Sequence, residues 1–83
     1  MPYYVYIIQS ELDGSYYIGS TQNLEERLKR HNQGRSKYTK TKLPWNLVYS
    51  EEFTDRSLAM KRENYIKKRK SKTYIEELVR TSR

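Results

Sequence analysis

Two tyrosines near the start of the chain have a spacing that would let them act together in a chemical site. Tyr6 and Tyr17 flank an Asp-Gly pair at 13–14, which is a strong hairpin-turn signal because glycine adopts positive φ without steric cost. If residues 3–9 and 15–19 are the strands of that hairpin, the two phenols can lie side by side. Tyrosine is also an ordinary strand residue, so propensity alone explains most of the nine tyrosines.

The next predicted element, a helix over residues 24–33, places an arginine and the single histidine on the side of its leucines. Asn23 is a suitable N-cap for this helix. Arg27 and His31 are four residues apart and therefore share a face. Burial of an unpaired charge is costly, so these side chains either reach solvent at the rim or point into a polar cleft.

Glu63 is the carboxylate of interest in a second predicted helix, over residues 55–69. It lies at the margin of the apolar stripe of that helix, whereas Arg62 lies nearer the centre of the stripe. An ordinary surface ion pair would explain a glutamate in a basic helix. A single carboxylate with water ligands is also sufficient for a hard cation such as Mg²⁺.

Several common kinds of catalytic site are excluded by composition. The chain has no cysteine, so thiol nucleophiles, disulfides and thiolate metal sites are absent. One histidine is too few for a two-histidine metal motif, and three glycines form no phosphate-binding loop.

The net charge of +7 indicates a polyanionic partner, of which nucleic acid is the commonest. Residues 1–26 contain no lysine or arginine, and the positive charge is concentrated in segments 27–42 and 61–72. A charged surface that only keeps the protein soluble is the alternative. The candidate phosphate contacts are Lys37, Lys40, Lys42, Lys67, Lys68 and Arg69. Tyr38 or Trp45 would either stack on an exposed base or pack internally.

The predicted elements form one α/β domain over residues 1–83, a small sandwich in the order ββαβαα with a three-stranded antiparallel or mixed sheet flanked by helices. The first strand is apolar on both faces and should be central. Gly19 lies on the strand face of Tyr17, where it would leave space for a ligand. The remaining elements are a loop over 35–44, a strand over 46–53 and a last helix that begins at Ser71 or Thr73.

Neither a membrane span nor a secretory signal is expected. No segment approaches the roughly 18 consecutive apolar residues of a spanning helix, and the N-terminal apolar run is strand-like and is interrupted by Gln9 and Glu11. A cytoplasmic protein is therefore the expectation.

Taken together, these residues resemble the GIY-YIG nuclease family, most closely its short stand-alone bacterial members. Tyr4-Val5-Tyr6 is similar to the first motif without its glycine, and Tyr17-Ile18-Gly19 reproduces the second motif. The helix sequence NLEERLKRHN (23–32) resembles the R-x-x-x-H pattern of the family, and RENYIKK (62–68) resembles the segment that carries its metal-binding glutamate. The resemblance covers nearly the whole chain.

The resemblance implies a site for metal-dependent hydrolysis of phosphodiester bonds. By this likeness, Glu63 would hold one divalent cation, Mg²⁺ or Mn²⁺, and Tyr17 would take a proton from the attacking water, with Tyr6 beside it. Arg27 would bind the scissile phosphate, and His31 would bond to a tyrosine or to the phosphate. The implied function is that of an endonuclease in repair or recombination, selective for irregular structures and acting on DNA rather than RNA.

A second interpretation is a nucleic-acid-binding module that has the nuclease fold but little activity. The absence of an accessory domain, which well-studied nucleases of this type usually carry, leaves it open. Nothing in the sequence indicates a protein partner or an oligomer.

Overall fold

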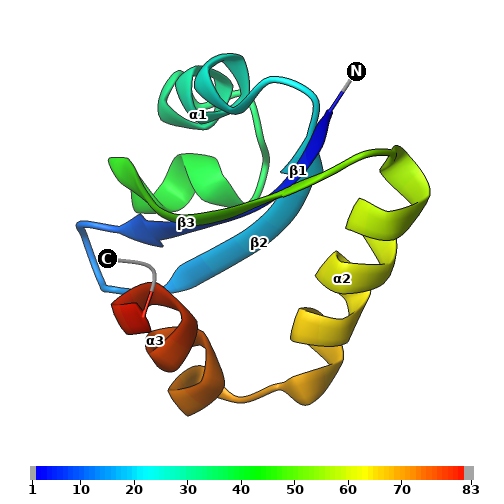
Figure 1. Cartoon of the computed structure of the whole chain (residues 1–83). Coiled ribbons are helices and arrows are strands. Elements are labelled where there is room, and N and C mark those ends of the chain that lie inside the picture. Colours follow the sequence, from blue (N-terminus) through cyan, green and yellow to red (C-terminus); the bar gives the residue numbers. More distant parts are fainter. Residues whose placement is uncertain (1, 82–83) are drawn as a thin grey trace.

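The computed structural model describes residues 2–81; residues 1, 82 and 83 of the predicted single domain lie outside the described residues. Its centre is a three-stranded antiparallel sheet in the order β2-β1-β3 (Figure 1). The strands are β1 (Tyr3–Ser10), β2 (Tyr16–Thr21) and β3 (Trp45–Phe53). The predicted fold class, strand number and element order are confirmed, and β1 is central as expected.

The β1–β2 turn is closed by short polar contacts around Gly14, which has a φ of 77°. The Asp13 carboxylate accepts hydrogen bonds from the backbone N–H and the hydroxyl of Ser15, at 3.0 and 2.6 Å. Lys42 adds an ion pair to Asp13 at 3.2 Å. Hydrogen bonding to Ser15 and the charge of Lys42 hold the pKa of Asp13 well below its usual range.

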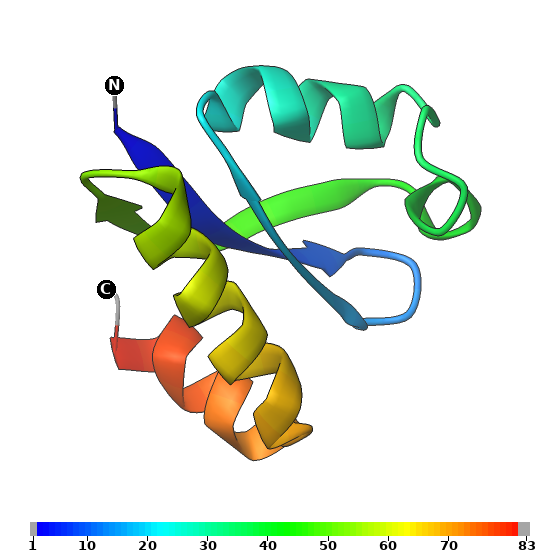
Figure 2. The ribbon, with the colours of Figure 1, turned by 90° about the vertical axis from the view of Figure 1, so that its right-hand side faces the viewer.

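One face of the sheet is covered by α1 (Leu24–Asn32) and the short 3₁₀ helix η1 (Thr39–Lys42) (Figures 1 and 2). Asn23 caps α1 as predicted, because its side chain accepts a hydrogen bond from Glu26 N at 3.0 Å. The core on this face contains Tyr6, Ile8 and Trp45. Prediction of residues 35–44 as loop throughout was wrong, since η1 forms where the tyrosine-threonine-lysine sequence gives no helical periodicity.

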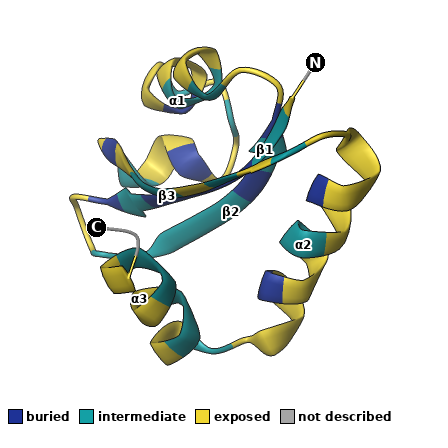
Figure 3. Cartoon of the chain, in the orientation of Figure 1, coloured by how far each residue is buried: buried dark blue, intermediate teal, exposed yellow. Residues whose placement is uncertain are grey.

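The opposite face is covered by α2 (Arg56–Arg69) and α3 (Lys72–Thr81) (Figure 2). Ala59 and Ile66 are buried on the side of α2 that faces the sheet and pack with Val5 (Figure 3). Asp55 caps α2, and Lys70, with a φ of 47°, ends it before the turn into α3. No helix among residues 2–81 is long and apolar enough to cross a membrane.

A β-bulge in β3 decides which of its side chains face α1. Ile7 pairs with Tyr49 but Ile8 pairs with Leu47, so Val48 is the extra residue. The bulge reverses the alternation, and Trp45 therefore packs into the core beneath α1 instead of facing α2.

Arg62 can lie near the centre of the apolar stripe of α2 because its charge is paired with a carboxylate of the sheet. Its guanidinium donates to both oxygens of Glu51, at 2.9 to 3.2 Å, and to the hydroxyl of Tyr74 at 3.1 Å. Tyr49 donates to the same carboxylate. The pKa of Glu51 is lowered against the effect of its burial, by hydrogen bonds from Arg62 and Tyr49 and by the charge of Arg62. These residues join β3 to α2 and α3.

Candidate active site

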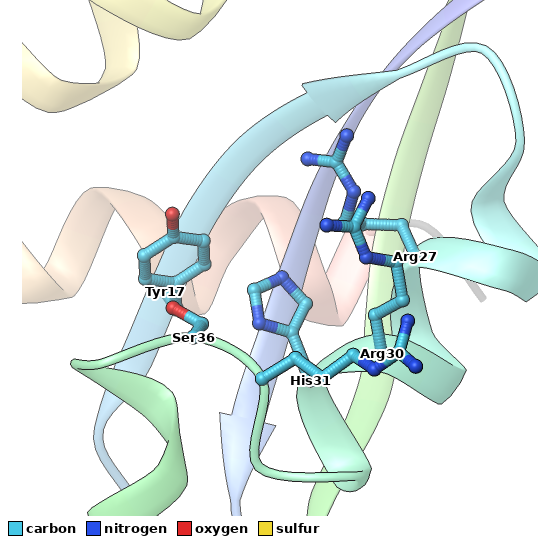
Figure 4. A pocket seen from close by; sticks show the side chains of 6 residues that line it. Tyr17, Arg27, Arg30, His31 and Ser36 are labelled. Carbon is cyan, nitrogen blue, oxygen red and sulfur yellow. The ribbon is translucent and has the colours of Figure 1, made fainter.

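A pocket of about 200 Å³ opens between β2 and the C-terminal half of α1 (Figure 4). Its lining is strongly basic and comes from three elements. It is formed by Tyr17 of β2, by Arg27, Arg30 and His31 of α1, and by Arg35 and Ser36 of the following segment. Arg27 and His31 therefore line a polar cleft, which was one of the two alternatives left open by the sequence.

His31 lies at the centre of a buried chain of hydrogen bonds. Its Nε2 is 2.9 Å from the hydroxyl of Tyr6, and its Nδ1 is 2.9 Å from the hydroxyl of Thr39. Tyr6 is 2% exposed, His31 4% and Thr39 0%. Both ring nitrogens thus have partners, and the ring is fixed beside Tyr17 and Arg27 (Figure 4).

The surroundings keep Tyr6 and His31 uncharged. Burial raises the pKa of Tyr6 to about 12, against the opposing effect of a hydrogen bond from Arg27. Burial, with the charges of Arg27 and Arg30, lowers the pKa of His31. Tyr6 is therefore a hydrogen-bonding partner near neutral pH, and a neutral histidine can act as both donor and acceptor.

Gly19 makes room for Tyr6 rather than for a ligand. It lies opposite Tyr6 on the neighbouring strand, and a Cβ at this position would be 2.7 Å from the Tyr6 Cζ. The expectation that this glycine leaves an open strand face was wrong, because the Tyr6 ring fills the space. Both motif tyrosines nevertheless lie side by side, with ring centroids of Tyr6 and Tyr17 6.5 Å apart.

Tyr17 is partly exposed at the pocket and surrounded by rings. Its ring centroid is 5.0 Å from that of His31, in an edge-on arrangement, and 5.9 Å from that of Tyr38, in a stacked one. Tyr38 is 51% exposed and has the Lys42 ammonium over its ring at 5.3 Å. Trp45 is 1% exposed, and its indole N–H donates to the Thr39 carbonyl at 2.8 Å. Of the two alternatives for Trp45, internal packing is therefore correct, because a buried ring cannot stack on a base.

Glu63 lies on α2, across the sheet from α1, and its charge contributes to the raised pKa of Tyr6. Its carboxylate pairs with Lys67 one turn later at 2.6 Å, which is the ordinary ion pair that the sequence allowed. The side chain of Glu63 is 15% exposed, against 48% for Lys67.

Glu63 offers a metal ion a single carboxylate. Among residues 2–81, no three histidine or carboxylate side chains are grouped closely enough to hold a metal ion together. The donor chemistry fits a hard cation that binds one carboxylate and keeps most of its water ligands, as Mg²⁺ does.

The six predicted phosphate contacts fall into two sets of three. Lys42 is bound to Asp13, Lys67 to Glu63, and Arg69 lies over the Tyr74 ring with its guanidinium carbon 4.3 Å from the centroid. The others are exposed, and no ion pair among residues 2–81 includes them: Lys37, Lys40 and Lys68. The second set has its charge free for an external anion.

Sequence reasoning missed the residues that hold the site together. Thr39 fixes His31, and Asn32 ties the end of α1 to the start of β3 by bonds to both Trp45 O and Trp45 N, at 3.0 and 2.7 Å. Neither lies in a periodic pattern. The pocket residues Arg30 and Arg35 were also missed, although both belong to the basic segment 27–42.

Comparison with known proteins gives a consistent family assignment. Residues 2–75 match the family described as the GIY-YIG catalytic domain. The chain is 48% identical to a UPF0213 protein from Bacillus licheniformis, with 90% of this chain and 80% of the relative covered. It is 39% identical to the UPF0213 protein YazA of Bacillus subtilis, over 90% of this chain and 79% of YazA.

A solved structure shows the same similarity in three dimensions. The solution NMR structure of a UPF0213 protein from Bacillus halodurans matches with a TM-score of 0.59 and 38% sequence identity. The match covers 98% of this chain and 85% of that protein. The arrangement of helices around a three-stranded sheet is therefore shared with a relative whose fold was determined independently.

Proposed function

Because the chain belongs to the GIY-YIG family, we propose that it is a divalent-metal-dependent endonuclease that hydrolyses phosphodiester bonds in DNA. The observation that carries this proposal is the basic pocket beside Tyr17, whose lining residue His31 is held from behind by hydrogen bonds to the buried Tyr6 and Thr39. A repair or recombination role and selectivity for irregular DNA are part of the proposal.

Three arginines prepare the pocket for a phosphate. Arg27, Arg30 and Arg35 come from two neighbouring segments and remain charged at any working pH. Guanidinium groups bind phosphate oxygens through paired N–H donors, so the pocket favours the extra negative charge of a pentacoordinate phosphate. Arg27 is the first candidate for the scissile phosphate because it lines the pocket together with Tyr17 and His31 (Figure 4).

Tyr17 is the candidate for the group that takes the proton of the attacking water at its hydroxyl oxygen. It is partly exposed in the pocket, whereas the buried Tyr6 keeps its own proton because its pKa is raised to about 12. Tyr6 and the neutral His31 then act as a positioning pair, since the hydrogen bond between them holds the His31 ring against the ring of Tyr17.

Glu63 is the candidate metal ligand. A bound divalent cation would supply Lewis-acid stabilisation of the phosphate oxygens. On the protein side, Glu63 must exchange its ion pair with the half-exposed Lys67 for this partner.

The test is nicking of supercoiled plasmid DNA with Mg²⁺ or Mn²⁺, with rates compared between wild type and two site variants. Tyr17→Phe removes the hydroxyl and should lower the rate by about 10²-fold or more, the usual contribution of a general base. Glu63→Gln should reduce the rate at least as strongly. The matched controls are Tyr65→Phe, an exposed tyrosine of α2, and Glu77→Gln, an exposed glutamate of α3, and both should nick as wild type does.

Equal rates in all five proteins would contradict the proposal and point to a contaminating nuclease. DNA binding without nicking in the wild type would favour the alternative, a binding module with the nuclease fold. The ion pair that already occupies Glu63 is the observation that favours this alternative.

A further inference from the structure

A second depression in the surface lies on the other side of β2 from the arginine pocket. It is formed where the beginning of β2 faces the junction of α2 and α3. Side chains alternate along β2, so Tyr17 points to the arginine pocket, while its neighbours Tyr16 and Ile18 line this groove. β2 is an edge strand, so a single extended ligand can pass over it and reach both sides.

The floor of the groove is apolar and its rim is basic. Tyr16, Ile18 and Ile75 supply rings and branched side chains. Lys67, Lys70 and Lys72 stand along the helix junction. An apolar floor next to cations suits a ligand that has a flat apolar part and an attached anion.

The charges around the groove show where that anion would lie. Asp13 also lines the groove, but it is paired with Lys42 at 3.2 Å. Burial raises the pKa of Tyr16, and the negative charge of the Glu76 carboxylate raises it further. The anion is therefore expected at Lys70 and Lys72, at a distance from Tyr16.

We propose that this groove binds an unpaired nucleotide of the DNA substrate, with its base against Tyr16, Ile18 and Ile75 and its phosphates on Lys70 and Lys72. Base stacking on aromatic and apolar side chains is tolerant of sequence, and phosphates provide the charge that the lysines require. Lys67 connects the groove to the candidate metal site, since it lines the groove and pairs with Glu63.

The inference rests on the proposed function and specifies its substrate class. A base inside a duplex is covered by its neighbours and its partner, so it reaches such a groove only after extrusion from the stack. The groove therefore selects DNA with a single-stranded segment beside the cleaved bond, such as a flap, a gap or a branch.

The experiment measures binding by fluorescence anisotropy in EDTA, where no cleavage occurs. One probe is a short single-stranded oligothymidylate. The other has the same length and phosphate charge, but every nucleotide is a tetrahydrofuran abasic analogue. Wild type should bind the base-bearing probe at least about fivefold more tightly, in line with the stacking energy of one base.

Two groups of variants separate the base contact from the phosphate contact. Tyr16→Ala should reduce the preference for the base-bearing probe to less than about twofold. Lys70→Asn with Lys72→Gln should weaken binding of both probes about fivefold or more, because two phosphate-binding charges are lost. Asparagine is chosen at position 70 because it tolerates the left-handed backbone there. Lys29→Gln with Lys61→Gln is the control for the same loss of charge at exposed positions outside the groove, and should change both affinities by less than about twofold.

A direct readout does not depend on how the variants fold. Irradiation of an oligonucleotide that carries 5-iododeoxyuridine should cross-link the wild type at Tyr16, as located by peptide mass spectrometry. Cross-links confined to Tyr17 or Tyr38, or equal affinity of wild type for the two probes, would overturn the proposal.

An acidic peptide gives a second outcome that would overturn it. If an oligoglutamate of equal charge binds as tightly as the oligonucleotide and loses affinity with the same variants, the groove is a protein-docking surface. Because every arm is run without a divalent cation, failure here leaves the nicking test unaffected. If the wild type shows the base preference but does not nick DNA, the groove proposal stands and the endonuclease proposal is wrong.

Discussion

At the scale of single residues, the site depends on polar groups that the fold keeps neutral. His31 is buried between Tyr6 and Thr39, and the charges of Arg27 and Arg30 act against its protonation. The only histidine of the chain is therefore in the protonation state in which it can accept a hydrogen bond on one nitrogen and donate on the other.

This state predicts a pH dependence of stability. The pKa of His31 is lowered in the folded protein, so the unfolded chain takes up a proton at higher pH than the folded one. The contribution of His31 to the free energy of unfolding is therefore fully present well above the ordinary histidine pKa of about 6.5. It is lost as the pH falls from that value towards the lower pKa of the folded protein. Urea unfolding at about pH 7.5 and about pH 5.5 should show a lower midpoint at the lower pH.

His31→Gln provides the comparison, because glutamine does not titrate. Its unfolding midpoint should change less between the same two pH values than that of the wild type. An equal change in both proteins would show that the carboxylates, and not His31, cause the dependence.

Thr39→Val should destabilise the protein by about 1–3 kcal/mol, because it leaves the buried Nδ1 of His31 without a partner. Thr41→Val is the matched control in the same 3₁₀ helix, since the Thr41 hydroxyl bonds to Tyr38 O in an exposed position. The control should cost less than about 1 kcal/mol. Equal losses in urea unfolding would mean that the Thr39–His31 bond adds nothing.

At the scale of elements, the β1–β2 pairing decides what the two motifs can do. The register places Gly19 opposite Tyr6, so the glycine of the second motif accommodates the tyrosine of the first. The β3 bulge similarly turns Trp45 towards α1, where its indole N–H binds the Thr39 carbonyl. Both features position the buried residues that hold His31 in the pocket.

Gly19→Ala tests the register. The new Cβ would overlap the Tyr6 ring, which cannot move far in a packed core, so a loss of about 1–3 kcal/mol is expected in urea unfolding. In a Tyr6→Leu background the ring is gone, and the same substitution should cost much less. Additive losses in the two backgrounds would show that Gly19 is required for another reason.

At the scale of the whole molecule, the charge distribution controls binding. The net charge of +7 is carried by segments that the fold places around the edge strand β2, in the arginine pocket and along the α2–α3 junction. Cations that already have partners have less to gain from an added phosphate than free ones.

The salt dependence of DNA binding should therefore reflect the free lysines. Replacing Lys37, Lys40 and Lys68 with glutamine should lower the slope of log affinity against log salt by about 0.9 for each duplex phosphate that the variant no longer neutralises. The control is the triple replacement of exposed cations elsewhere on α1 and α2, namely Lys29, Arg56 and Lys61. Equal slopes for both triple variants would place the duplex on a different face.

The sequence alone determined the three strands, the three α-helices and the residues of the family motifs. The continuous apolar run of the first strand, the Asp-Gly turn and the cap at Asn23 act over a few residues, so they are readable without a fold. The same is true of Tyr17 and Arg27, whose spacing within an ordered set of motifs carried the family resemblance.

Only the tertiary structure decided how these residues are used. Thr39 and Trp45 enter the site through contacts with distant segments, and Gly19 is explained by a ring on the neighbouring strand. Such contacts depend on strand register and on a single-residue bulge, which leave no periodic trace in the chain. The division of the basic residues into paired and free cations is likewise a property of the fold, because their partners, such as Asp13 for Lys42, are fixed only when the elements pack.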